Sequence, residues 1–222
     1  MMLSRSVVAE VIGTAMLLAI VVGSGIMGEK LGQGNLAVAL LANAIATGAG
    51  LYVLIVIFGP VSGAHFNPVV SWVSVWCGQM PARQGLSYSL AQVGGALAGV
   101  AAAHSMFGLN IVQVSTHVRS SLGEGFGEIV ATFGLVLVIL LTARFRAEAI
   151  PATVAAYITS AYWFTSSTSF ANPAVTIARA MTDTFAGIAP QSIANFIAAQ
   201  IIGALAATLS ARWLASGTSN GQ

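Results

Sequence analysis

Long apolar segments separated by short polar ones dominate the chain. A helix needs roughly 20 residues to cross a bilayer, and six segments reach that length, at about residues 5–27, 36–58, 84–106, 124–143, 149–167 and 192–215. Glu10 interrupts the apolar stretch of the first, and no clear cleavage site follows it, so we expect a retained span rather than a signal peptide. The pattern predicts an all-α membrane protein with six transmembrane helices.

Two further apolar segments, residues 67–78 and 172–183, are too short to span. About 12 residues make roughly 18 Å of helix, about half of a bilayer core. Each segment begins with Asn-Pro, and Asn is a good N-cap while Pro is tolerated at the first helical position. We therefore expect two re-entrant half-helices that enter from opposite faces and meet tip to tip at the midplane.

The two halves of the chain resemble each other. "AEVIGTAML" (9–17) matches "GEIVATFGL" (127–135), "SGAHFNPVVSW" (62–72) matches "SSTSFANPAVTIA" (166–178), and "AQVGGALAG" (91–99) matches "AAQIIGALA" (198–206). Each half holds three spans, an odd number, so the second half is inverted relative to the first. We expect one channel domain, 1–222, made of inverted repeats at 1–110 and 111–222, with a disordered tail at 215–222.

Composition narrows the class further. Of the 222 residues, 57% are hydrophobic and 6% charged, whereas soluble domains carry about 25% charged residues. The net charge of +2 is too small to indicate nucleic-acid binding, and the single cysteine, Cys77, excludes an internal disulfide. The sequence has no metal-ligand cluster, nucleophile constellation or nucleotide-binding loop, so we expect no enzyme, no catalytic residue, no metal and no cofactor.

Basic residues indicate the orientation. With a cytoplasmic N-terminus, five arginines lie inside and three basic residues outside, and the short loop between the halves carries two of the five. The inner set is Arg5, Arg83, Arg144, Arg146 and Arg212, and the outer set is Lys30, Arg119 and Arg179. We expect both termini in the cytoplasm and, from the short loops and lack of a targeting sequence, a bacterial inner membrane.

The paired signatures "HFNPVV" and "FANPAV", the first preceded by "SGA", resemble those of the major intrinsic protein family, the aquaporins and aquaglyceroporins. The matching Glu10 and Glu128 fit as well, and the resemblance covers essentially the whole chain. It implies the aquaporin fold, a passive channel for water and small neutral solutes, and a homotetramer with one pore in each subunit.

The Asn-Pro motifs also have a direct physical meaning. Helix N-termini at Asn67-Pro68-Val69 and Asn172-Pro173-Ala174 would place positive potential at mid-membrane, which opposes cations and protons. The two asparagine amides can donate hydrogen bonds to a passing oxygen, or they serve only as N-caps. Carbonyl groups of the segments before them would form a ladder of acceptors: Gly63, Ala64 and His65, then Ser169, Phe170 and Ala171.

Two interpretations fit Glu10 and Glu128, since a carboxylate inside a span is costly and functional by default. They are a proton-coupling site or, as their symmetric placement favours and the resemblance implies, braces for the loops that carry the half-helices. His65 either gates the pore or donates to such a carboxylate. A proton- or ion-coupled secondary transporter and a non-conducting structural protein are the alternative functions.

Val175 departs from the family pattern, because most members have an arginine directly after the second motif. Counting offsets from the two asparagines assigns the other constriction positions to Thr47, Ser160 and Ser169, which with Val175 predicts a wide, uncharged filter. The sequence resembles atypical bacterial channels linked to arsenic resistance that also lack this arginine. That resemblance implies glycerol, urea, arsenite and methylated arsenicals as solutes besides water.

Arg179 lies one helical turn beyond Val175, on the same side. Our hypothesis places its charge in the outer vestibule, where it attracts anionic or strongly polar solutes. The alternatives are an ion pair with Asp183 or contact with lipid headgroups.

Overall fold

The computed structural model describes residues 4–216, which form helices joined by irregular segments, with no strand among them. The long helices are α1 (Arg5–Gly32), α2 (Leu36–Ser62), α4 (Ala82–Met106), α5 (Leu122–Phe145), α6 (Ile150–Phe164) and α8 (Ile193–Ser216). Two short helices, α3 (Pro68–Trp76) and α7 (Pro173–Arg179), lie between them, and the 3-10 turns η1 (Ala147–Ala149) and η2 (Pro190–Ser192) precede α6 and α8.

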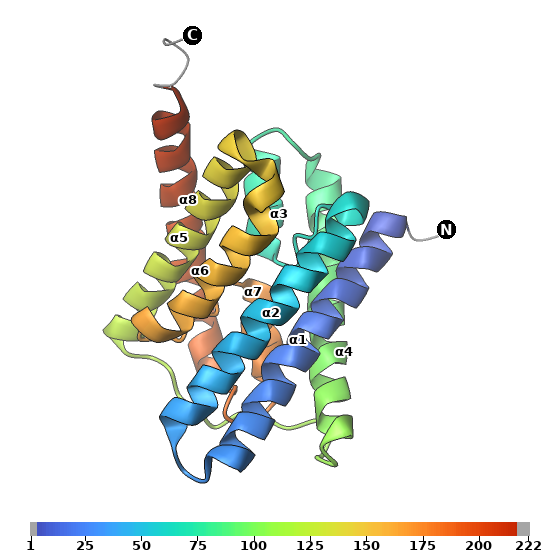
Figure 1. The fold of residues 1–222 in the computed structure, drawn as a ribbon, viewed down its shortest axis with the longest axis vertical. Coiled ribbons are helices and arrows are strands. Elements are labelled where there is room, and N and C mark those ends of the chain that lie inside the picture. Colours follow the sequence, from blue (N-terminus) through green and yellow to red (C-terminus); the bar gives the residue numbers. More distant parts are fainter. Residues whose placement is uncertain (1–3, 217–222) are drawn as a thin grey trace.

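The second half repeats the packing of the first. α1 packs against α2 and α4, and in the same way α5 packs against α6 and α8, while α2 and α6 join the two halves. Both ends of the chain lie at one end of the bundle (Figure 1). The short helices α3 and α7 lie inside this arrangement and contact each other, as expected for half-helices of an inverted repeat.

Six long helices occupy the six predicted spans, with shifted ends. Five of them are long and apolar enough by length and composition to cross a membrane, whereas α6 has 15 residues, or about 22 Å. The half-helix α7 ends at Arg179 and not at residue 183 as expected, because the chain turns away after it. There Asp183 N–H donates to Gln113 Oε1 at 3.0 Å, which ties this segment to the connection between α4 and α5.

Glycines bring the helices within each half close together. A Cβ on Gly95 of α4 would lie 2.4 Å from the carbonyl oxygen of Val11, and one on Gly99 would lie 2.2 Å from that of Ala15, both in α1. The equivalent approach of α8 to α5 occurs at Gly203. The small-residue runs of α4 and α8 thus serve helix contacts inside the subunit.

The disordered tail was expected to begin at residue 215, which is two residues too early. α8 continues through Ser216, so residues 215 and 216 are helical. Residues 217–222 lie outside the described part of the chain.

Candidate functional site: a cavity between the two halves

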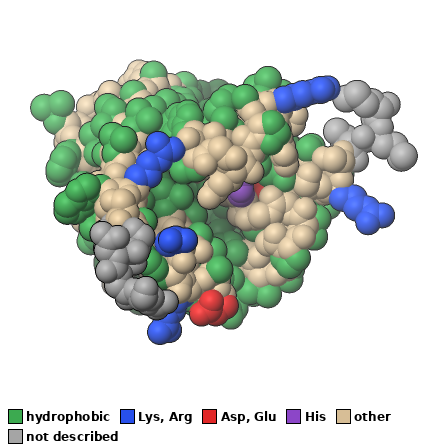
Figure 2. Space-filling view, turned by 90° about the horizontal axis from the view of Figure 1, so that it is seen from above, with side chains coloured by type: hydrophobic (Ala, Val, Ile, Leu, Met, Phe, Trp, Pro, Cys, Tyr) green, Lys and Arg blue, Asp and Glu red, His purple; other side chains and the backbone are tan. Residues whose placement is uncertain are grey.

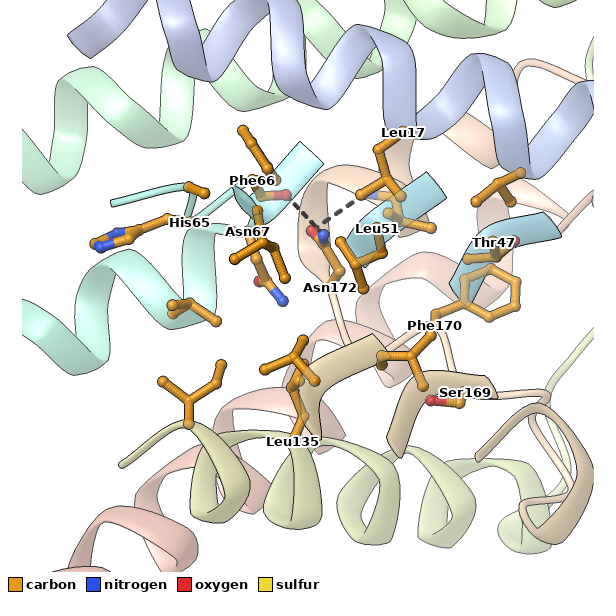
Figure 3. A pocket seen from close by; sticks show the side chains of 18 of the residues that line it. Leu17, Thr47, Leu51, His65, Phe66, Asn67, Leu135, Ser169, Phe170 and Asn172 are labelled. Carbon is orange, nitrogen blue, oxygen red and sulfur yellow. Dashed lines mark hydrogen bonds between the residues drawn. The ribbon is translucent and has the colours of Figure 1, made fainter. Parts of the chain in front are cut away.

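A cavity of about 210 Å³ lies between the halves and passes both asparagines. Its wall reaches from Gln79, in the connection after α3, to Arg179 at the end of α7, so the cavity extends to both sides of Asn67 and Asn172. Figure 3 shows Asn67 and Asn172 facing the same space from the two half-helices. On the face that carries the termini, a hollow is ringed by basic side chains and contains a histidine (Figure 2), and His65 is the histidine of the cavity wall.

Each asparagine caps its own half-helix. The Asn67 Oδ1 atom accepts a hydrogen bond from Val69 N–H at 3.0 Å, and Asn172 Oδ1 accepts from Ala174 N–H at 3.0 Å and Val175 N–H at 3.3 Å. These bonds satisfy amide groups that the first turn of a helix leaves unpaired. The sequence-based prediction of Asn-Pro helix starts therefore agrees with the geometry.

Each asparagine also binds the other half. Asn67 Nδ2 donates to the carbonyl oxygen of Ala171 at 2.8 Å. Asn172 Nδ2 donates to that of Phe66 at 2.8 Å, as Figure 3 shows. A side-chain amide has two N–H groups, so one N–H of each asparagine is committed to the protein. The second N–H can donate to a solute, and capping and donation are combined in one side chain.

The segments before the half-helices share an unusual backbone. Gly63, Ala64 and Phe66 have φ values of 87°, 50° and 49°. The residues 105 positions later, in the second half, also have positive φ: Thr168 (60°), Ser169 (51°) and Ala171 (47°). Non-glycine residues rarely adopt this left-handed conformation, which costs of order 1–3 kcal/mol each.

This backbone leaves several carbonyl oxygens for the cavity. Within residues 4–216, no protein donor reaches the carbonyl oxygens of Gly63, Ala64, His65, Ser169 or Phe170, all of which belong to residues of the cavity wall. Ala171, the last member of the predicted ladder, differs. It is not part of the wall, and its carbonyl accepts from Asn67.

Glu10 is buried completely and holds the first strained segment. Its carboxylate accepts from His65 N–H at 3.0 Å, Phe66 N–H at 2.7 Å and Ser62 Oγ–H at 2.6 Å. Gln92 Nε2 donates to the same carboxylate at 2.7 Å. Four donors directed at one carboxylate favour the bracing interpretation over a proton-coupling site.

Glu128 does the same in the second half. It accepts from Phe170 N–H and Ala171 N–H, both at 2.9 Å, and from Gln200 Nε2 at 2.6 Å. Gln200 also donates to Thr176 Oγ1 at 2.9 Å, as Gln92 does to Ser71 Oγ at 3.0 Å. The repeated sequence thus builds the repeated network that supports the strained backbone.

His65 lies in the cavity wall beside this network. Its Nδ1 atom is 3.1 Å from Ser71 Oγ, and its ring packs edge-on against Tyr88 with centroids 5.5 Å apart. Its backbone, rather than its ring, donates to Glu10. The ring is therefore positioned at the pore, on the side of the termini.

Three of the four predicted filter residues line the cavity: Thr47, Ser169 and Val175. Ser160 does not, and its assignment was wrong. It is exposed, and its hydroxyl donates to the Tyr157 carbonyl at 2.8 Å.

The reason lies in the helical period of α6. Val154, Ile158 and Tyr162 recur every four residues and face the cavity, whereas Ser160, two residues from Ile158, points about 200° away. Tyr162 lines the cavity with its hydroxyl 3.3 Å from Thr47 Oγ1. The spacing of these three residues was the signal that counting from Asn172 missed.

Arg179 is 3% exposed and lines the cavity. Its guanidinium carbon lies 3.5 Å from the centroid of the Phe170 ring, a cation–π contact, and its Nε donates to the Ala186 carbonyl. Burial is incompatible with headgroup contact. The alternative pairing with Asp183 is also wrong, because that carboxylate accepts from Thr116 N–H and Oγ1–H at 2.7 and 2.9 Å.

The connection between α4 and α5, residues 107–121, packs onto the segment after α7. Ser115 N–H donates to the Ala180 carbonyl at 3.0 Å, and Ala189 N–H donates to the His117 carbonyl at 2.7 Å. The bonds from Thr116 hold the pKa of Asp183 below its ordinary value, with His117 adding to the effect.

Arg119 of this connection was not singled out as a site residue. Its Nε donates to the Gly187 carbonyl at 3.0 Å, and its guanidinium carbon lies 5.3 Å from the centroid of the Phe170 ring. Burial lowers its pKa, an effect that Glu124 and Glu128 partly oppose, but a guanidinium remains charged in proteins. Only the fold brings this residue to the site.

Two inverted halves, paired half-helices and a cavity between them define a membrane channel of the re-entrant-helix class. The family model described as "Major intrinsic protein" matches residues 1–165, and the chain belongs to this family. It is an integral multi-pass membrane protein and a passive channel for water and small solutes. Members of the family are commonly tetramers.

Individual proteins agree with this assignment. The aquaglyceroporin AqpS of Rhizobium meliloti (strain 1021) is 52% identical over 212 residues, which cover 96% of this chain and 91% of that protein. The probable aquaporin TIP2-2 of Oryza sativa subsp. japonica is 35% identical over 144 residues, 63% of this chain and 57% of that protein. The structure of the aquaglyceroporin from Plasmodium falciparum shares the fold, with a TM-score of 0.72 and 18% identity over 94% of each chain.

Proposed function

We propose that the channel passes glycerol, urea and arsenite in addition to water, through a constriction wider than that of a water-specific pore. The observation that carries this proposal is Val175, which lines the cavity in the first turn of α7 without contributing charge. Thr47 and Ser169, also small, lie in the same wall. Tyr162 and Arg179 also lie in this wall, so the proposed width depends on the small side chains at these three positions.

The pore centre suits neutral hydroxylated solutes. The uncommitted N–H groups of Asn67 and Asn172 supply donors, and the open carbonyl oxygens of the strained segments supply acceptors. Leu17, Leu51 and Leu135 give the remaining wall an apolar character (Figure 3). Glycerol and As(OH)₃ present hydroxyls in similar ways, and methylated arsenicals add an apolar group that this wall accommodates.

Exclusion of protons and cations would rest on the half-helix N-termini, whose positive ends meet at Asn67 and Asn172. Glu10 and Glu128 act in this proposal as braces, since backbone and glutamine donors occupy them. The same occupation disfavours the secondary-transporter alternative, which needs a free coupling site. We further propose a homotetramer in a bacterial inner membrane, with both termini cytoplasmic.

Stopped-flow light scattering on proteoliposomes tests the proposal. Wild-type channels should pass water, glycerol and urea, and Val175→Arg should keep water flux but lose most glycerol and urea flux because the arginine narrows the constriction. Ser160→Ala is the matched control, because its exposed side chain lies outside the cavity wall. Arsenite uptake would be measured next with the same three proteins.

Two outcomes would contradict the proposal. If the wild-type channel passes water alone, the constriction is narrower than proposed. If Val175→Arg passes glycerol as fast as wild type, Val175 does not set the width of the pore.

A further inference from the structure

We infer that Arg119 and Arg179 together form a binding site for small monocarboxylates at the channel mouth opposite the termini. The inference rests on the proposed function in one respect, that this mouth opens into the conducting cavity. It adds an anionic ligand to a channel otherwise suited to neutral solutes, and it gives Arg119 a role beside Arg179.

The two guanidinium groups converge on one aromatic ring. Arg179 comes from the end of α7 and Arg119 from the connection between α4 and α5, and their Cζ atoms lie 3.5 and 5.3 Å from the centroid of the Phe170 ring. Their Nε atoms donate to the neighbouring carbonyls of Ala186 and Gly187. One short segment therefore fixes the position and orientation of both groups.

Neither arginine has a carboxylate partner within residues 4–216. The nearby acids are engaged elsewhere: Asp183 by Thr116, Glu124 in the capping box of α5, and Glu128 by the backbone before α7. No protein acceptor among the described residues reaches the terminal nitrogens of either guanidinium. A buried charge is costly unless it is paired, and Arg179 is 3% exposed. The unpaired donors point to a ligand that supplies the missing negative charge.

The chemistry of the site selects a carboxylate with a small apolar group. A planar guanidinium matches the two oxygens of a carboxylate, and a second guanidinium nearby adds further donors. Val175, Ile158 and Leu51 line the cavity that Arg179 reaches and offer an apolar surface for a methyl or ethyl group, while Arg119 adjoins it through the Phe170 ring.

Acetate is a suitable probe, with binding to the purified channel in detergent at pH 7 measured by saturation-transfer NMR on its methyl signal. Arg119→Gln should weaken acetate binding about tenfold, since loss of a charge-assisted contact is worth at least about one such factor. Arg119 is half-buried, so its replacement is better tolerated than that of Arg179. Arg119→Lys keeps the positive charge but loses the planar, two-pronged donor group, so its acetate affinity should lie between those of wild type and Arg119→Gln.

Lys30→Gln is the control, because it removes one positive charge from an exposed position at the end of α1. The end of α1 lies, like the proposed site, at the end of the bundle opposite the termini (Figure 1). It should bind acetate as wild type does. Equal binding by wild type and Arg119→Gln, or no acetate signal from wild type, would overturn the inference. An equal loss in Lys30→Gln would also overturn it, because the effect would then be one of overall charge.

The same preparations separate this inference from the proposed function. In proteoliposomes, external acetate should slow glycerol entry through wild-type channels but not through Arg119→Gln channels. Acetate binding without any glycerol flux would refute the proposed function and leave the site standing. Glycerol flux that acetate never affects, in a channel without acetate binding, would refute the site alone.

Discussion

Asn67 donates a hydrogen bond of 2.8 Å to the carbonyl oxygen of Ala171, the residue directly before Asn172. Asn172 returns an equal bond to Phe66, directly before Asn67. Each half-helix start therefore fixes the strained residue that precedes the other. The two motifs form one structural unit across the pore.

These two bonds between the halves predict that Asn172→Ala destabilises the channel by more than the loss of a helix cap alone would. A cap alone is worth about 1 kcal/mol, and a lost buried hydrogen-bond partner about 1–3 kcal/mol more. Asn35→Ala is the matched control, since Asn35 also accepts two N–H bonds, at 3.1 and 3.2 Å, but caps the exposed start of α2. Thermal unfolding in detergent should give the larger loss for Asn172→Ala, and equal losses would contradict the prediction.

Glu128→Gln should destabilise the channel by about 2–4 kcal/mol. A glutamine has only one acceptor oxygen, so its NH₂ group would replace one of the two carboxylate oxygens. In one orientation the NH₂ group faces Phe170 N–H, and in the other it faces both Ala171 N–H and Gln200 Nε2. Either orientation leaves a buried donor unpaired. Glu29→Gln, at an exposed position in α1, should leave stability within about 0.5 kcal/mol. The midpoint of thermal unfolding checks both, and a neutral Glu128→Gln would show that the brace is dispensable.

Two glycines of α4 should respond to alanine with opposite signs. Gly94→Ala should stabilise the helix by up to about 1 kcal/mol, because a Cβ there meets nothing within 4 Å. Gly99→Ala should destabilise, because its Cβ would lie 2.2 Å from the Ala15 carbonyl oxygen and force α1 and α4 apart. Unfolding midpoints of the two variants test this contrast, and the same sign for both would refute the proposed close approach.

The connection between α4 and α5 should loosen from the segment after α7 in acid, because its Thr116 is held by the Asp183 carboxylate. Its folded-state pKa is lowered, chiefly by the bonds from Thr116, so its stabilising contribution is complete above the unfolded value of about 3.9 and is lost as the pH falls through the folded value. Unfolding midpoints between pH 7 and pH 3 should fall more steeply for wild type than for Asp183→Asn. Parallel curves would exclude Asp183 as the source of the dependence.

Sequence periodicity was sufficient to predict the spans, the half-helices and the inverted repeat, because each depends on local pattern and length. It was also sufficient to place Asn67, Asn172, Glu10 and Glu128, since their spacing is repeated. Ser160 was misplaced because counting from Asn172 crosses an irregular segment whose path the sequence does not specify.

Other features depend on contacts between distant segments. The positive φ of Ala64 and Ser169 has no signal in residue type, since glycine is the usual choice for that conformation. Arg119 reaches Phe170 only because the connection between α4 and α5 packs over the end of α7. Such long-range placement requires the folded chain.

The hydrogen bonds to Glu10 (bracing bonds) and the bonds that Asn67 and Asn172 make to the opposite half (crossing bonds) can form at different stages of synthesis. Glu10 and Gln92 belong to the first half, so that half can shape its own re-entrant segment before the rest is synthesised. The crossing bonds require Asn172 and Ala171. The contacts between the two asparagine motifs at the centre of the pore can therefore form only after both halves have been synthesised.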